Sequence, residues 1–151
     1  MGTRGHVLTV LDASALVALL IDEPARPAVE SLLRRRPPPS ISAVNLGEVI
    51  DSLVRGHGHH EELVRDRIDL LMVGGLEIEP VWLGGARLAA SLRVQHYRRA
   101  RSAVSMADCF CLATAIALET DLATTDPALA QMARAVGVAV VALPDSTGTL
   151  P

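Results

Sequence analysis

The sequence lacks lysine entirely and has very few aromatic residues. All fourteen cationic side chains are therefore arginines, and seventeen acids give a formal net charge of −3 at pH 7. This balance argues against a protein that holds nucleic acid mainly through net positive charge, but it leaves room for a local basic patch. The aromatic residues are one each of three kinds, Trp82, Tyr97 and Phe110. They cannot form the platform of rings on which RNA-reading modules stack splayed bases.

Cysteines and long hydrophobic runs are scarce as well. Cys109 and Cys111 lie two positions apart without a second Cys or His pair at zinc-site spacing, so we expect reduced structural thiols. The longest apolar runs, 15–21 and 135–143, fall far short of the roughly 18 residues that a membrane span requires. No cleavage pattern of a signal peptide follows the N-terminal stretch. We therefore expect a cytoplasmic protein with no membrane segment.

The length and the hydropathy pattern predict one α/β domain. The chain has 151 residues, half of them apolar, which is the size of a single domain over 1–151; we expect residues 144–151 to form a loose tail. Short apolar runs alternate with amphipathic stretches. Strands are expected at 7–11, 40–42, 76–81, 122–125 and 138–143, with helices at about 13–21, 24–36, 43–55, 60–73, 85–97, 105–118 and 127–136. Helices between successive strands predict a mostly parallel sheet of about five strands, covered on both faces.

Four acidic residues are the candidates for chemistry. Asp12 and Asp126 each end a predicted strand, and a parallel sheet brings such ends to one edge. Asp108 stands in Ser105-x-x-Asp108, a variant of the capping box, in the first turn of a predicted helix. Glu48 lies among apolar residues of a predicted helix, a position where a charged side chain indicates a specific role.

Each of these acids also has a purely structural interpretation. Asp12 and Asp126 can cap helices, Asp108 suits the positive end of a helix dipole, and Glu48 can be a solvated residue at a helix edge. Unpaired carboxylates gathered at one edge, however, repel one another and raise one another's pKa unless a cation lies among them. Mg²⁺ prefers oxygen ligands, so the set predicts a divalent metal site without histidine or cysteine.

At these acids the chain resembles the PIN-domain nucleases, and within them the VapC-type toxins of bacterial toxin–antitoxin pairs. The similarity runs from Val7 to about Val141 in the order and approximate spacing of the family. The matching stretches are V-L-D-A-S-A-L around Asp12, I-S-A-V-N-L-G-E-V around Glu48, S-M-A-D-C around Asp108 and L-A-T-T-D ending at Asp126. The resemblance implies a PIN-like α/β/α sandwich.

The resemblance also implies an activity and partners. It implies a Mg²⁺- or Mn²⁺-dependent endoribonuclease, a cognate antitoxin protein and a homodimer. Its catalytic and metal-binding residues would be Asp12, Glu48, Asp108 and Asp126, of which Asp126 is the least uniform in the family. Two hydroxyl side chains, Ser14 and Thr124, would support the site through hydrogen bonds. In-line attack by a metal-activated water would give 5′-phosphate and 3′-hydroxyl products.

Several features allow other interpretations. The cluster Arg98, Arg99 and Arg101 precedes the Asp108 helix and is a candidate RNA contact. A phosphohydrolase of the haloacid dehalogenase type and a receiver-like module both require a lysine, which this chain lacks. A housekeeping RNA-processing PIN nuclease and a catalytically silent PIN-like binding module stay open as alternatives.

Overall fold

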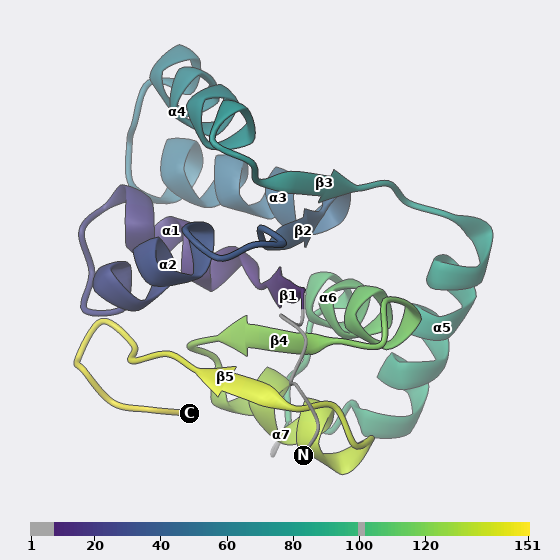
Figure 1. The fold of residues 1–151 in the computed structure, drawn as a ribbon. Helices are drawn as coiled ribbons and strands as arrows, with labels where there is room; N and C mark the ends of the chain where they lie inside the picture. Colours follow the sequence, from purple (N-terminus) through teal and green to yellow (C-terminus); the bar gives the residue numbers. More distant parts are fainter. Residues whose placement is uncertain (1–7, 100–101) are drawn as a thin grey trace, which may run out of the picture.

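The protein forms a layered α/β structure. The computed structural model describes residues 8–99 and 102–151. Its strands are β1 (Thr9–Leu11), β2 (Ser40–Ser42), β3 (Glu77–Glu79), β4 (Asp121–Thr124) and β5 (Val140–Ala142). Its helices are α1 (Ala13–Leu20), α2 (Arg26–Leu33), α3 (Ala43–Asp51), the π-helical segment η1 (Ser52–Gly56), α4 (Glu61–Val73), α5 (Leu83–His96), α6 (Met106–Ala117) and α7 (Pro127–Ala135). Figure 1 shows the helices on both sides of the sheet, as the sequence predicts.

The sheet is parallel, and β1 lies at its centre. The strand order is β3-β2-β1-β4-β5. Val10 pairs with Ser40 of β2 on one side and with Leu122 of β4 on the other. The chain builds the β2 side first and then crosses to the β4 side, so the order reverses between β1 and β4. Ligands of open parallel sheets bind beyond the strand ends at such a reversal, which here is where Asp12 and Asp126 follow their strands.

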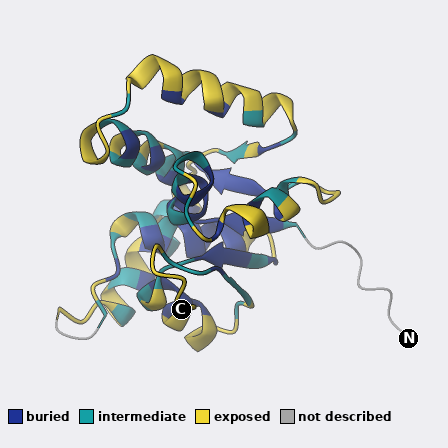
Figure 2. Ribbon diagram, turned by 90° about the vertical axis from the view of Figure 1, so that its left-hand side faces the viewer, coloured by how far each residue is buried: buried dark blue, intermediate teal, exposed yellow. Residues whose placement is uncertain are grey.

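Two hydrophobic cores lie on opposite faces of the sheet, because successive strand residues point to opposite sides. Val10 and Leu122 pack with residues of α5, α6 and α7. Their neighbours Leu11 and Ala123 pack with residues of α1, α2, α3 and α4. Figure 2 shows β1, β2, most of β4 and the helix faces turned toward them as buried, whereas the edge strands β3 and β5 are intermediate or exposed. This arrangement is the α/β/α sandwich that the sequence predicts.

Helix α4 covers less of the core than its sequence pattern suggests. Val64 and Ile68 are buried, but Leu63 and Leu70 are 56% and 70% exposed. In Figure 2, α4 lies along the top of the molecule with most of its surface exposed. The apolar face of this helix therefore divides into a core stripe and an exposed stripe.

The helix predicted over 43–55 changes its geometry at its C-terminal end. Helix α3 ends at Asp51, and η1 continues it with wider turns, in which the His57 amide donates to the Ser52 carbonyl at 3.0 Å. The spacing of apolar residues cannot reveal this change, because a single turn is too short to separate the two periods. π-Helical turns occur often at functional sites.

The chain ends in a turn that follows β5. Asp145 Oδ1 accepts hydrogen bonds from the Thr147 and Thr149 amides at 2.8 and 2.9 Å. The single-domain boundary and the looseness of residues 144–151 stay predictions. Across residues 8–99 and 102–151, no helix has the length and apolar character needed to cross a membrane.

Candidate active site

Asp12 is the most deeply buried acid of the candidate site. It follows β1 and is 3% exposed. Its Oδ2 atom accepts hydrogen bonds from the Ser14 hydroxyl at 2.7 Å and from the Thr124 hydroxyl at 2.9 Å. Burial raises the pKa of Asp12, and these two hydroxyls oppose that rise. Asp12 makes no side-chain cap of α1, so the purely structural interpretation as a helix cap does not account for it.

The same two hydroxyls tie Asp12 to the end of β4. Thr124 Oγ1 accepts from the Asp126 amide at 2.9 Å, and Ser14 Oγ accepts from the Thr125 amide at 3.2 Å. Each hydroxyl therefore donates to the Asp12 carboxylate and accepts from a backbone N–H just after β4. This arrangement fixes both the carboxylate and the path of the chain to Asp126.

Asp126 and Asp108 both serve as caps at helix N-termini. Asp126 Oδ1 accepts from the Ala128 amide at 2.7 Å in the first turn of α7. Asp108 Oδ2 accepts from the Ser105 amide at 2.6 Å, and Ser105 Oγ accepts from the Asp108 amide at 3.0 Å, which completes the predicted capping box. The capping bonds occupy Asp126 Oδ1 and Asp108 Oδ2, so the second carboxylate oxygen of each is not needed for its cap.

Burial and repulsion by neighbouring carboxylates raise the pKa values of Glu48 and Asp108. Glu48 in α3 has its pKa raised to about 7, first by burial and then by the charges of Asp12 and Asp108. Asp108 is 8% exposed and has its pKa raised to about 6, first by burial, with the charge of Asp12 adding to the rise. The neighbouring carboxylates thus raise the pKa values of Glu48 and Asp108, as expected for acids gathered at one edge.

All four acids line one cavity. It has a volume of about 430 Å³ and lies beyond the ends of β1 and β4. The other charged residues that line it are two further acids, Glu23 and Asp51, and one cation, Arg55. Among the described residues, no group of three or more acids, histidines or cysteines is gathered closely enough to hold a metal ion.

Arg98 of the predicted basic patch lies away from the acids. It lines a separate cavity of about 300 Å³, together with residues at the C-terminal ends of α5 and α7 such as His96 and Ala135. Arg98 donates from Nη1 to the Tyr97 carbonyl at 2.8 Å. Arg99 follows it on the chain, and Arg101 lies outside the described residues. An RNA contact by this cluster stays a prediction.

Sequence reasoning missed Arg55 and its partner Asp51, which line the cavity, and Asn45, which lies one helical turn before Glu48. Arg55 follows Glu48 by seven residues and Asp51 by four, so the three share one side of the helix. That spacing is a signal that could have found Arg55. Its guanidinium pairs with Asp51 through two contacts, Nε to Oδ1 at 2.9 Å and Nη2 to Oδ2 at 2.7 Å.

A family model for the PIN domain matches residues 9–135, which include all four acids. The chain belongs to the PIN domain family. The match begins at β1 and ends with α7, so it contains the whole candidate site and every strand except β5.

Solved structures share the fold of this PIN domain. VapC20 of Mycobacterium tuberculosis, a toxin that cleaves the sarcin-ricin loop, is 21% identical with a TM-score of 0.65 over 87% of this chain and 96% of its own. A toxin–antitoxin complex from Klebsiella pneumoniae contains a chain that is 20% identical with a TM-score of 0.62, over 88% and 95%. FitAcB of Neisseria gonorrhoeae is 22% identical with a TM-score of 0.60, over 88% and 96%. A comparison with curated protein sequences finds no significant match.

Proposed function

We propose that this PIN domain is a divalent-metal-dependent endoribonuclease and the toxin of a toxin–antitoxin pair. One observation carries the proposal: four carboxylates from different segments line a single cavity, and Arg55 is the only cation among the described residues that line it. Such a set is costly to ionise without a bound positive charge. The similarity of fold to VapC20, a toxin that cleaves the sarcin-ricin loop, supports RNA as the substrate class.

The donor set fits Mg²⁺ or Mn²⁺. Both ions prefer oxygen ligands, and Mg²⁺ usually keeps several waters while one or two carboxylates contact it directly. Binding of this kind needs only one or two direct carboxylate ligands, and four carboxylates line the cavity, although no three of the described residues form a closed cluster. The residues that would hold the ion are Asp12, Glu48, Asp108 and Asp126. When bound, the ion would lower the pKa of a water molecule and offset charge on the phosphate.

The protein itself prepares these carboxylates. The hydroxyls of Ser14 and Thr124 hold Asp12 in one orientation, and Asp12 is already 97% removed from solvent, as its 3% exposure shows. The helix caps use one oxygen each of Asp108 and Asp126, which leaves the other oxygen for a ligand. Glu48, with its pKa raised to about 7, would exchange a proton near neutral pH until an ion favours its charged form.

Arg55 would supply the contact to the RNA backbone at this cavity. The pair with Asp51 uses two of the five N–H donors of the Arg55 guanidinium, so the other donors can reach a phosphate. The Asp51 carboxylate holds the guanidinium in one orientation. Seven helical residues span roughly 10 Å, so Arg55 would meet a phosphate near the one that reacts beside Glu48.

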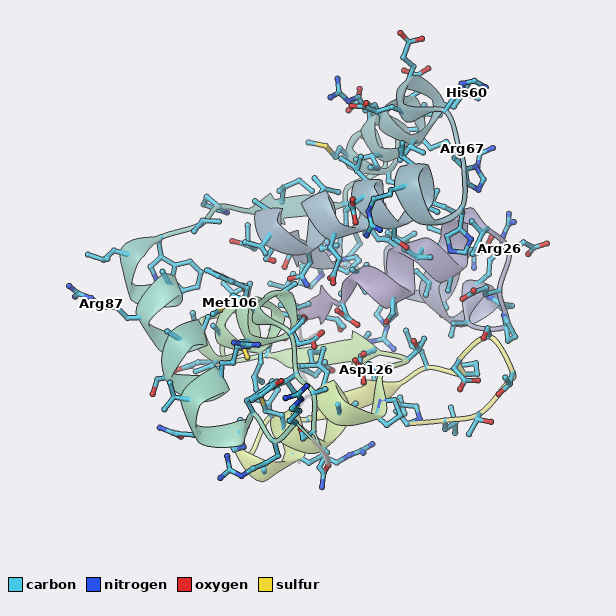
Figure 3. All side chains as sticks on the ribbon, turned by 180° about the vertical axis from the view of Figure 1, so that it is seen from behind. Arg26, His60, Arg67, Arg87, Met106 and Asp126 are labelled. Carbon is cyan, nitrogen blue, oxygen red and sulfur yellow. The ribbon has the colours of Figure 1, made fainter. Side chains whose placement is uncertain are left out.

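An apolar groove supports the antitoxin partner. It has a volume of about 500 Å³, lies between α1, α2 and α4, and contains the side chains Leu19, Leu20, Leu33, Leu70 and Leu71. Charged residues at its edges are Arg26, Glu30 and Arg67, and Figure 3 shows Arg26 and Arg67 on the same side of the molecule. An amphipathic segment of an antitoxin would bury its apolar face there. The homodimer is part of the same proposal and is tested by the mass of the purified protein in solution.

The test of the proposed function is cleavage of a mixed RNA pool. Purified wild type and Asp108→Asn are incubated with Mg²⁺, with Mn²⁺ and with EDTA, and the product ends are analysed. The expected result is metal-dependent cleavage that leaves 5′-phosphate ends and falls by about a thousandfold in Asp108→Asn, roughly 4 kcal/mol of transition-state stabilisation. Asparagine can still accept the Ser105 amide bond, so the variant keeps its helix cap. Cyclic phosphate ends that form in EDTA would contradict the proposal.

A further inference from the structure

A buried amide connects two helices of the candidate site. Asn45 in the first turn of α3 is 0% exposed. Its Nδ2 atom donates to the backbone carbonyl of Ala107 at 3.1 Å, across 62 positions of the chain. Ala107 directly precedes Asp108 in α6. The bond therefore fixes the α3 backbone against the segment that carries Asp108.

The other atoms of the amide are also engaged. The Ser42 hydroxyl donates to the side-chain oxygen Oδ1 of Asn45, and Ser42 Oγ accepts from the backbone N–H of Asn45 at 3.1 Å. Glu48 stands one helical turn after Asn45. Asn45 thus lies beside one acid of the cavity along α3 and bonds the backbone next to a second acid, Asp108.

Helix formation does not require this amide. Helix α6 begins with its own capping box, formed by Ser105 and Asp108. A helix carbonyl such as that of Ala107 already has its partner four residues onward in the helix. Helix α3 is likewise capped by the Ser42 hydroxyl alone. The caps act within each helix and do not determine the distance between α3 and α6. The bond from the Asn45 side chain to Ala107 joins the two helices and helps to set that distance.

We propose that Asn45 is a positioning residue, which sets the spacing between the Glu48 and Asp108 carboxylates for a divalent ion. The inference rests on the proposed function and deepens it. A leucine of similar size would fill the same space but leave the spacing unfixed. An aspartate would lose the donor to Ala107 and add a negative charge.

The experiment separates positioning from stability. Binding of Mn²⁺ is measured by electron paramagnetic resonance, well below the melting temperature of each variant, and melting temperatures are measured in EDTA. The variant is Asn45→Leu. The matched control is Thr114→Val, which removes another buried hydrogen bond of α6, from Thr114 Oγ1 to the Phe110 carbonyl at 2.8 Å, in a residue that does not line the acidic cavity.

The expected result is a loss of stability in both variants but a loss of Mn²⁺ affinity in only one. Asn45→Leu should bind Mn²⁺ about tenfold more weakly or worse, the effect of removing a partner that orients a metal ligand, and Thr114→Val should bind as wild type does. Asn45→Ala, which also removes the donor to Ala107 but adds no bulk and keeps the Ser42 cap of α3, should show a similar loss and provides the test if Asn45→Leu does not fold.

Two outcomes would overturn the inference, and they differ in what else they overturn. Wild-type Mn²⁺ affinity in a folded Asn45→Leu, or in Asn45→Ala if the leucine variant does not fold, would reduce Asn45 to a structural residue and leave the proposed function intact. A wild type that binds no Mn²⁺ would overturn the proposed metal site and this inference together.

Discussion

The acidic cavity and the apolar groove are similar in size but are held in different ways. The cavity, about 430 Å³, has its acids fixed by side-chain hydrogen bonds between separate segments, such as the 2.9 Å bond from Thr124 to Asp12. The groove, about 500 Å³, is formed by leucines that pack without directional bonds, and Leu70 in it is 70% exposed. Directional bonds suit an ion, which requires fixed ligands, and exposed apolar packing suits a partner that brings its own apolar surface.

The largest effect expected from this contrast is on the groove. Leu70→Asp places a charge in the apolar surface, so affinity for the proposed antitoxin should fall by about a hundredfold or more, as at a buried hot spot. RNA cleavage by the free protein should not change. Val94→Asp, at an 82% exposed position of α5 outside the groove, is the control. Equal antitoxin affinity in Leu70→Asp and wild type would remove the groove from the account.

The hydroxyls that support Asp12 should show the next largest effect. Ser14→Ala and Thr124→Val each remove a bond to a buried carboxylate, so Mn²⁺ affinity should fall roughly 10- to 100-fold in isothermal titration. Thr9→Val is a matched control, because the buried Thr9 hydroxyl has no hydrogen-bond partner among the described residues. The contrast is refuted if the control loses as much affinity as the two variants.

A smaller effect is expected at the mouth of the cavity. Arg55→Gln removes one phosphate contact, so the affinity for single-stranded RNA should fall by about three- to tenfold and the slope of log K against log salt should lessen by about 0.7. Arg65 forms a similar exposed pair with Glu61 on α4 at 2.6 Å, so Arg65→Gln is the control. Fluorescence anisotropy in the absence of divalent ions measures both. An unchanged slope in Arg55→Gln would assign the pair to helix stability alone.

The smallest effect is a pH dependence of stability. Glu48 and Asp108 have their pKa values raised in the folded protein to about 7 and about 6. Their contribution to stability is therefore complete below the unfolded-state values and is lost as pH rises through 6 to 7. In EDTA, the melting temperature should decline between about pH 5 and pH 8 by more in wild type than in Glu48→Gln. A decline of the same size in both would contradict the raised pKa of Glu48.

Bound Mg²⁺ should reduce that decline, because the ion binds the deprotonated carboxylates and stabilises the folded state most where they are charged. Scanning calorimetry with and without Mg²⁺ at each pH measures the difference.

The sequence was sufficient to predict the fold and the gathering of the acids. Strands of alternating or continuous apolar character end at Asp12 and close to Asp126, and strand ends of a parallel sheet meet at one edge whatever the loops do. The capping box of Asp108 is a local pattern and was equally readable. These features depend on short stretches of chain or on a general rule of sheets.

The sequence was not sufficient where a contact depends on the path of a loop. Arg98 stands ten residues before Asp108 in sequence, but it lines a different cavity from the acids, near the other end of α7. Asn45 meets Ala107 only because α3 and α6 pack side by side, which no local pattern reveals. Arg55 lies between these cases, since its helical spacing from Glu48 was visible but the π-helical turn that carries it was not.

The central claim is that four carboxylates form one divalent-metal site, and equilibrium Mn²⁺ binding to wild type and to Asp12→Asn tests it most directly. Asparagine can still accept the hydroxyl bonds of Ser14 and Thr124, and Asp69→Asn on the exposed side of α4 is the control. The account predicts that wild type and Asp69→Asn bind Mn²⁺ alike, and that Asp12→Asn binds at least about tenfold more weakly. Equal binding by all three proteins, or none by wild type, would contradict it.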